Sequence, residues 1–140
     1  MDIKKLEDIL SQYDFILFAL LFGSYAKGQE GYLSDIDIAI ETNRELDLLT
    51  CGDIMATLET FYGKKIDLVI TNELYKTNPK MAFNITDNHK VIMLKDEQRY
   101  IDFKVNSLKY YFDTAYMYKI FDKSLQERLE NGTFGKVKAS

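Results

Sequence analysis

Apolar and polar residues alternate along the chain in a way that predicts several strands of one sheet. The unbroken apolar run at 15–22 predicts a fully buried first strand, and period-two alternation at 35–40 predicts a half-buried strand. Alternation over 66–70 predicts a further strand, in which Asp67 points away from the face with the three larger aliphatic residues. A short strand is expected at 91–94.

Apolar residues at helical spacing predict the helices that flank this sheet. One helix near the N-terminus covers the sheet, and a second ends at Gly63, a residue type that suits a helix C-terminus. A third helix starts at Pro79 and reaches about Asp87, and the longest runs from Asp96 to about Asp122. We therefore expect an α/β (α+β) fold, with a mixed sheet, flanking helices and a long C-terminal helix. The apolar stripes of the first, second and longest helices are Ile3, Leu6, Ile9, Leu10 and Tyr13; Leu48, Cys51, Met55, Leu58 and Tyr62; and Ile101, Val105, Leu108, Phe112 and Ala115.

Length and composition favour one compact domain. The chain has 140 residues, of which we assign 1–130 to the domain and 131–140 to a loose tail. The formal net charge of -4 argues against binding to long nucleic acid. Cys51 is the only cysteine, which excludes an intramolecular disulfide and fits a reducing compartment. The apolar run at 15–22 is too short to span a bilayer, and residues 1–13 lack the features of a signal peptide, so we expect a cytoplasmic protein without membrane contact.

A glycine–serine pair and two aspartates form the most informative motif. Gly23 and Ser24 follow the buried strand directly, and Asp35 and Asp37 come after ten intervening residues, on one face of the next strand. Two carboxylates side by side on an apolar strand repel each other, and a divalent cation such as Mg²⁺ or Mn²⁺ would compensate them. Gly23 would let the backbone approach a phosphate, whose oxygens the Ser24 hydroxyl and the following N–H groups can bond. The alternative is structural, because Asp-x-Asp alone is common in turns and surface strands.

This motif resembles the signature of the DNA polymerase β-like nucleotidyltransferase superfamily. The segments LFGSYAKG and SDIDIAI are similar to those of its smallest members, the minimal nucleotidyltransferases or MNT-type antitoxins. The segment KMAFNITDNHKVIMLKDEQRYIDF resembles the helix, short strand and long helix that close those chains, so the resemblance extends over about 5–120. It implies that Asp67 is a third catalytic carboxylate. Many relatives carry Arg where this chain has Tyr25 or Lys27, and Lys27 would bring charge to a phosphate without bidentate geometry.

The resemblance implies a nucleotidyl transfer from ATP with two Mg²⁺ ions, or Mn²⁺ in their place. Asp35 and Asp37 would hold the ions, and Gly23 and Ser24 would hold the triphosphate. Asp67 would share the second ion and serve the acceptor hydroxyl, either as its base or by orienting it. In minimal nucleotidyltransferases the acceptor is a tyrosine of a HEPN-type ribonuclease toxin. The resemblance thus implies an antitoxin that AMPylates a partner encoded next to it.

Two other functions stay open at this point. The protein could be a non-catalytic binding module that neutralises its partner by covering it. It could also be a small-molecule nucleotidyltransferase that completes its acceptor site by dimerising. The sequence does not specify the base of the nucleotide, and ATP comes from the family analogy alone.

Several other residues have simpler interpretations. His89, the only histidine, is expected on the surface, and Cys51 is expected in the core. Glu41 and Glu45 flank a predicted helix start, where they would favour the helix dipole rather than bind metal. Four tyrosines wrap around the longest helix, so some must be exposed, and they form either an interface or ordinary core and scattered surface contacts. These tyrosines are Tyr110, Tyr111, Tyr116 and Tyr118.

Overall fold

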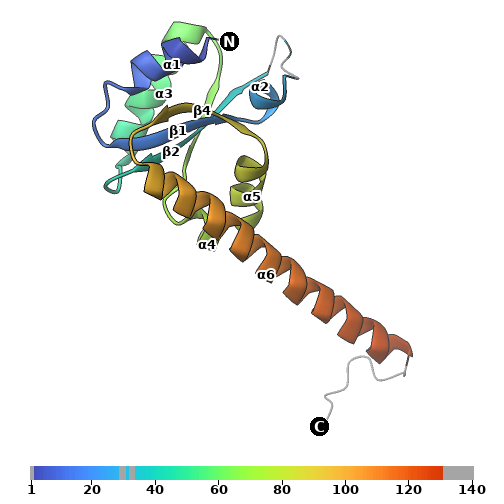
Figure 1. Cartoon of the computed structure of the whole chain (residues 1–140). Coiled ribbons are helices and arrows are strands. Elements are labelled where there is room, and N and C mark those ends of the chain that lie inside the picture. Colours follow the sequence, from blue (N-terminus) through green and yellow to red (C-terminus); the bar gives the residue numbers. More distant parts are fainter. Residues whose placement is uncertain (1, 29–30, 32–33, 131–140) are drawn as a thin grey trace.

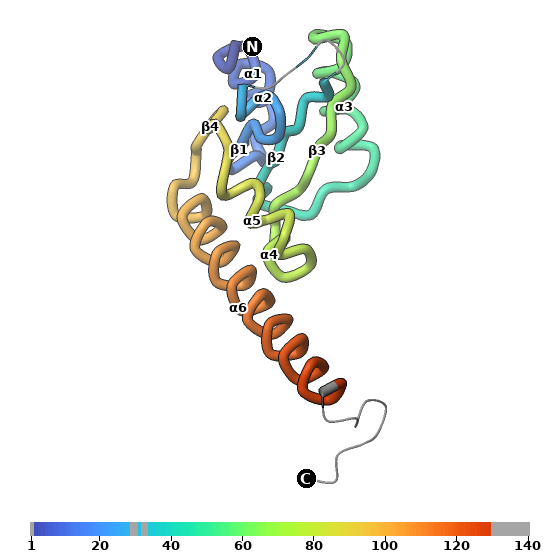
Figure 2. The backbone as a smooth tube through the Cα atoms, turned by 90° about the vertical axis from the view of Figure 1, so that its right-hand side faces the viewer, coloured from blue at the N-terminus to red at the C-terminus, as the bar shows by residue number. Residues whose placement is uncertain are grey.

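Four strands form one mixed sheet in the computed structural model, which describes residues 2–28, 31 and 34–130. The strand order is β3-β2-β1-β4 (Figure 2). β1 runs antiparallel to both β2 and β4, whereas β2 and β3 are parallel. The strands are β1 (Ile16–Phe22), β2 (Ile36–Thr42), β3 (Ile66–Ile70) and β4 (His89–Leu94). The mixed sheet that the apolar pattern predicts is confirmed.

Helices cover both faces of the sheet. α1 and α3 pack on one face, and α4, α5 and α6 lie on the other, from which α6 extends away (Figures 1 and 2). The helices are α1 (Ile3–Leu10), α2 (Ser24–Lys27), α3 (Leu48–Tyr62), α4 (Leu74–Thr77), α5 (Pro79–Asp87) and α6 (Glu97–Glu130). In the part of the chain that the structure describes, no helix is both long and apolar enough to cross a membrane. The proposed tail at 131–140 lies outside the described residues.

Alternation along β2 divides its side chains between two cores. Ile36, Ile38 and Ile40 join the core beneath α1 and α3, whereas Ala39 joins the core beneath α5 and α6. Asp37 shares the face of Ala39, because side chains two residues apart point the same way. The strand was expected to be half-buried, but it lies inside the sheet and both of its faces are covered.

The ends of α3 and α5 follow their local sequence. The Asp47 side chain accepts a hydrogen bond of 2.7 Å from the Thr50 backbone N–H, which satisfies a free donor at the start of α3. Gly63 ends this helix in the left-handed conformation, with φ of 63°. At α5, the Asn78 side chain caps the helix and Pro79 occupies the first turn. The predicted ends at Gly63 and Pro79 are therefore confirmed.

The predicted apolar face of α3 is rotated in the structure. Ile54 and Leu58 are fully buried, whereas Leu48 is 90 % exposed and Cys51 is half-buried rather than in the core. Leu48 is the first residue of α3, and none of the described elements covers its side chain. The sequence pattern also missed the short helix α4.

The longest helix is longer than predicted, and it buries another face. It continues to Glu130, and its buried side chains are Phe103 and Ser107. This face is buried because β1, α4 and α5 present aromatic rings to it. The contacts are Phe18 with Tyr100 and Phe103, Tyr75 with Tyr110, and Phe83 with Tyr111. The predicted stripe that includes Ile101, Val105 and Phe112 is exposed instead.

Candidate active site

Two of the predicted carboxylates lie side by side on adjacent parallel strands. Asp37 on β2 and Asp67 on β3 are register partners, so their side chains leave the sheet on the same face. Asp35 immediately precedes β2 and is half-buried. The structure therefore brings Asp67, which is thirty residues further along the chain, next to the Asp35 and Asp37 motif.

Gly23 lies directly against the Asp37 carboxylate. Phe22, the last residue of β1, is the register partner of Asp37, and Gly23 follows with φ of 71° and ψ of -148°. A Cβ atom at this position would lie 3.1 Å from Asp37 Cγ and closer still to its Oδ2 atom. Glycine is therefore required both by the backbone conformation and by the space that Asp37 occupies. Ser24 begins α2 beside this contact and is half-buried.

The site raises the proton affinity of Asp37. The pKa of Asp37 rises from 3.8 to about 6, first because burial disfavours the charged form. The negative charge of Asp67, a hydrogen bond with its side chain and the charge of Asp35 raise this pKa further. Asp37 thus occupies a place where a positive charge would be stabilising.

The donor set fits a hard divalent cation. Mg²⁺ typically takes one or two carboxylates and completes its octahedron with water and substrate phosphate oxygens. In the described residues, no three His, Cys, Asp or Glu side chains are arranged as ready ligands of one ion. The neighbouring Asp37 and Asp67 supply the two carboxylates that such an ion needs. The nearby Lys65 Nζ lies 3.9 Å from Asp67 Oδ1, in an ion pair exposed enough to be displaced, and the sequence pattern did not identify it.

The remaining predicted phosphate ligand is at the edge of this site. Lys27 is exposed in the last turn of α2, which ends at Gly28. The structure thus brings Gly23 together with Asp37 and places Ser24 beside this contact. Lys27 is the last residue of the short helix α2, and the loop that follows it is only partly described.

His89 is part of the row of residues that contains the two aspartates. Register pairs place His89, Phe22, Asp37 and Asp67 side by side across the four strands. The imidazole is half-buried, with Nδ1 2.9 Å from the Ile85 carbonyl oxygen and Nε2 2.7 Å from the Tyr100 hydroxyl. The prediction of a surface histidine is therefore wrong, because β4 begins at His89, two residues earlier than expected, and brings it to α5 and α6.

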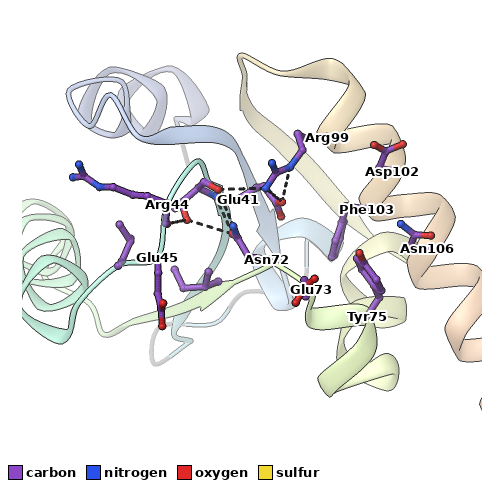
Figure 3. A pocket seen from close by; sticks show the side chains of 13 residues that line it. Glu41, Arg44, Glu45, Asn72, Glu73, Tyr75, Arg99, Asp102, Phe103 and Asn106 are labelled. Atoms are coloured by element: carbon purple, nitrogen blue, oxygen red, sulfur yellow. Dashed lines mark hydrogen bonds and ion pairs between the residues drawn. The ribbon is translucent and has the colours of Figure 1, made fainter.

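Glu41 occupies the opposite end of β2. The prediction that it favours a helix dipole is wrong, because Glu41 lies within the strand and is only 6 % exposed. Its Oε2 atom accepts hydrogen bonds from Arg99 Nη2 at 2.7 Å and Nε at 3.0 Å (Figure 3). Its Oε1 atom accepts one from Thr71 Oγ1 at 2.5 Å. Period-two alternation from Asp37 through Ala39 places Glu41 on the same face. No local pattern, however, identifies a partner 58 residues away.

A hollow of about 850 Å³ opens beside this ion pair, at the carboxyl ends of β2 and β3 (Figure 3). Arg44, Glu45 and Asn72 line it from the sheet side, and α6 contributes Arg99 and Asp102. Asp37 and Asp67 lie near the amino ends of the same strands, so this hollow is separate from the carboxylate site. Glu45, which was expected to favour the helix dipole, is exposed at its rim.

The fold and the site together are typical of nucleotidyltransferases: a glycine–serine turn after the first strand lies against aspartates on two neighbouring strands. The family model described as polymerase beta, nucleotidyltransferase matches residues 4–98. The chain belongs to this family.

Curated relatives have a more specific name. Two proteins of Methanocaldococcus jannaschii named "Putative protein adenylyltransferase" are similar to this chain. One is 29% identical over 86 residues, which cover 61% of this chain and 86% of that protein. The other is 31% identical over 93 residues, which cover 61% of this chain and 93% of that protein.

Solved structures share the fold over nearly the whole chain. A chain from a toxin–antitoxin crystal structure with AMP-PNP has a TM-score of 0.68 at 20% identity, covering 94% of this chain and 98% of that one. A chain from the complex of a tri-AMPylated Shewanella oneidensis HEPN toxin with its MNT antitoxin has a TM-score of 0.60 at 20% identity. This match covers 92% of this chain and 93% of that one.

Proposed function

We propose that this protein is the antitoxin of a toxin–antitoxin pair and transfers AMP from ATP to a tyrosine hydroxyl of a HEPN-type ribonuclease toxin. The observation that carries the proposal is the contact of Gly23 with Asp37, beside Asp67 on the next strand. Membership of the nucleotidyltransferase family supports the reaction class. The relatives named as protein adenylyltransferases support a protein acceptor, and the structural likeness to MNT chains supports a HEPN partner.

The residues at the site have distinct roles in this proposal. Gly23 lets the backbone approach the triphosphate, the Ser24 hydroxyl bonds a phosphate oxygen, and Lys27 adds positive charge at the edge. Asp35, Asp37 and Asp67 hold two Mg²⁺ ions, or Mn²⁺, which neutralise phosphate charge and lower the pKa of the acceptor hydroxyl. Asp35 and Asp37 serve mainly as ligands.

Asp67 also serves the acceptor. Its carboxylate orients the tyrosine hydroxyl and takes its proton. The tyrosine oxygen then forms a bond to the α-phosphorus of ATP while the bond from that phosphorus to the bridging oxygen breaks, and pyrophosphate leaves. Most of the rate comes from positioning and electrostatic stabilisation, because the phosphoryl transition state needs little covalent help from the protein.

A protein acceptor would complete this site. The described residues form the nucleotidyltransferase core, and in this proposal a partner protein supplies the other wall of the site. We place the reaction in the cytoplasm, where ATP and a ribonuclease target are both available.

The test is AMP transfer to the HEPN-type protein encoded beside this gene. Labelled ATP and Mg²⁺ would be mixed with both proteins, with this protein at one hundredth of the partner's concentration. We expect label on the partner, a mass gain of one or more AMP units, and ribonuclease inhibition that persists after the proteins are separated. The Asp35→Asn variant should lose all three, and Asp8→Asn, an exposed aspartate on α1, should lose none.

Other outcomes would contradict the proposal in distinguishable ways. Protection only at equal amounts, reversed by separation, would identify a binding module. Label on a small molecule with none on the partner would identify a small-molecule nucleotidyltransferase.

A further inference from the structure

The second half of α6 exposes large apolar side chains. The helix contacts β1, α4 and α5 as far as Phe112, whose ring still packs edge-on against Phe83 of α5, and then extends beyond them (Figures 1 and 2). Between 112 and 121, hereafter the projecting segment, six large apolar side chains are each between 51 % and 71 % exposed. They are Phe112, Tyr116, Met117, Tyr118, Ile120 and Phe121.

These side chains surround the helix instead of forming one stripe. At 3.6 residues per turn, Phe112, Met117 and Tyr118 point to three sides separated by about 120°. The charged residues Asp113 and Lys119 lie between them and do not gather into one polar face. A surface helix normally keeps a polar face, and a helix that is apolar all round is normally buried.

The exposed area is large enough for a stable interface. Each aromatic side chain offers 150–250 Å² in all, so the exposed parts of the six residues amount to roughly 700 Å² of apolar surface. Monomeric proteins rarely expose more than a few hundred square ångströms in one patch. A standard protein interface buries about 800 Å² on each partner.

Two occupants fit this surface poorly. The charged residues spread around the segment would enter the lipid if it lay in a membrane, and no described helix is apolar enough to span one. A second copy of this chain, paired along one helix seam, would cover only one of the three apolar sides. Covering all three requires an occupant that encloses the helix.

We propose that the projecting segment inserts into an apolar groove between helices of the protein partner. The groove contacts at least three sides of the segment, and its polar rim meets charged residues such as Asp113 and Lys119. The partner's identity as the HEPN-type acceptor rests on the proposed function. Docking of a separate helix would then hold the acceptor protein while its tyrosine reaches the carboxylate site, which lies on the same face of the sheet as α6.

The test measures the affinity of the HEPN-type partner for single variants on each side of the helix. Phe112→Glu, Met117→Glu and Tyr118→Glu should each weaken binding by at least tenfold in calorimetric titration. Gln126→Glu, on the same helix beyond the segment, makes the same charge change and should leave the affinity within twofold. Phe112 also contacts Phe83 of α5, so circular dichroism and thermal unfolding check that all three variants keep the helix content and stability of the parent.

The outcomes separate this inference from the proposed function. Wild-type affinity in all three variants would overturn the docking site, and weakening at only one side would overturn the enclosing groove. Wild-type binding without AMP transfer would overturn the proposed enzymatic function and leave the docking site to be judged by the variants. A wild-type protein that does not bind the HEPN-type partner would overturn both.

Discussion

The two ends of β2 carry acidic side chains on the same face of the sheet, in opposite electrostatic situations. At one end Glu41 is buried and accepts two hydrogen bonds from the Arg99 guanidinium. At the other end Asp37 lies beside Asp67 and near Asp35, and its pKa is raised to about 6. Arg99 supplies the cation for Glu41, and this ion pair holds α6 to the sheet. Where the carboxylates are available to an external cation, the exposed Lys65 lies beside Asp67.

This difference distinguishes a structural carboxylate from a functional one. A buried charge with its own cation is stable in the folded protein and has little capacity left for a ligand. A cluster of carboxylates without such a cation destabilises the free protein and is stabilised when a metal–triphosphate complex binds. The predictions below test the two ends of β2 separately, from the largest expected effect to the smallest.

The largest effect should come from the carboxylates in AMP transfer. Asp37→Asn should lower the transfer rate by about a thousandfold and weaken triphosphate binding, because it removes a ligand of both ions. Asp67→Asn should lose a similar factor in the chemical step and largely keep triphosphate binding. Single-turnover kinetics with fluorescent-nucleotide titration would separate the two. A normal transfer rate in Asp67→Asn would mean that Asp67 is only a polar residue on a strand.

At the other end of β2, breaking the ion pair should mainly affect stability. Arg99→Met leaves Glu41 buried without its cation and should cost about 3 kcal/mol, the lower end of the range because Arg99 is partly exposed. Urea denaturation measures this loss. The double variant Glu41→Gln with Arg99→Met should recover most of it, since no unpaired charge remains. A loss below about 1 kcal/mol in Arg99→Met would show that water solvates Glu41 well enough without it.

Local sequence patterns predicted the half of the site that forms within one strand–turn–strand unit. Gly23, Asp35 and Asp37 are close along the chain, and their geometry follows from a turn and a period of two. Alternation also gave the correct face for Asp67. Its pairing with Asp37 depends on strand order, which no local pattern predicted; the resemblance indicated only that Asp67 is a third carboxylate.

The parts that failed depend on long-range contacts. The sequence suggested that Glu41 lies at a helix start, because its partner Arg99 is distant along the chain and only the fold brings the two together. His89 looked exposed until β4 placed it against Tyr100. The helix α6 has two apolar faces, and the periodicity of the sequence does not show which of them packs against the sheet and the other helices. The aromatic rings of Phe18, Tyr75 and Phe83 decide this through packing.

Ligand binding should stabilise the fold through the carboxylate end of β2. At one hundred times the dissociation constant, Mg²⁺ with a non-hydrolysable ATP analogue should add about 2.7 kcal/mol to the free energy of unfolding. For a chain of this size, that raises the melting temperature by several degrees. The Asp35→Asn, Asp37→Asn double variant should show no shift, whereas Arg99→Met should keep it from a lower starting temperature. An unchanged shift in the double variant would place the nucleotide elsewhere.

The smallest effect should be a gain in stability when one carboxylate of the cluster is neutralised. The pKa of Asp37 is about 6 in the folded protein and 3.8 as its ordinary value, so the folded state holds its proton more tightly. The metal-free protein should therefore lose stability as the pH rises from about 4 to 6, because the unfolded chain releases this proton first. The full shift corresponds to about 3 kcal/mol, and screening of the half-exposed group reduces it to about 1 kcal/mol.

The variant Asp37→Asn cannot ionise at this position, so it should not show the loss of stability that ionisation of Asp37 causes. At pH 7, without metal, the variant should be about 1 kcal/mol more stable than the parent, a gain of a few degrees in melting temperature. Well below pH 3.8 the two proteins should unfold together, because Asp37 is then protonated in both states of the parent. Saturating Mg²⁺ with the ATP analogue at pH 7 should reverse the order, because only the parent gains the binding energy. Asp8→Asn should track the parent throughout. The variant and the parent could instead be equally stable at pH 7 without metal. Solvent would then already relieve the repulsion between the carboxylates, and the electrostatic contrast between the two ends of β2 would be smaller than the geometry indicates.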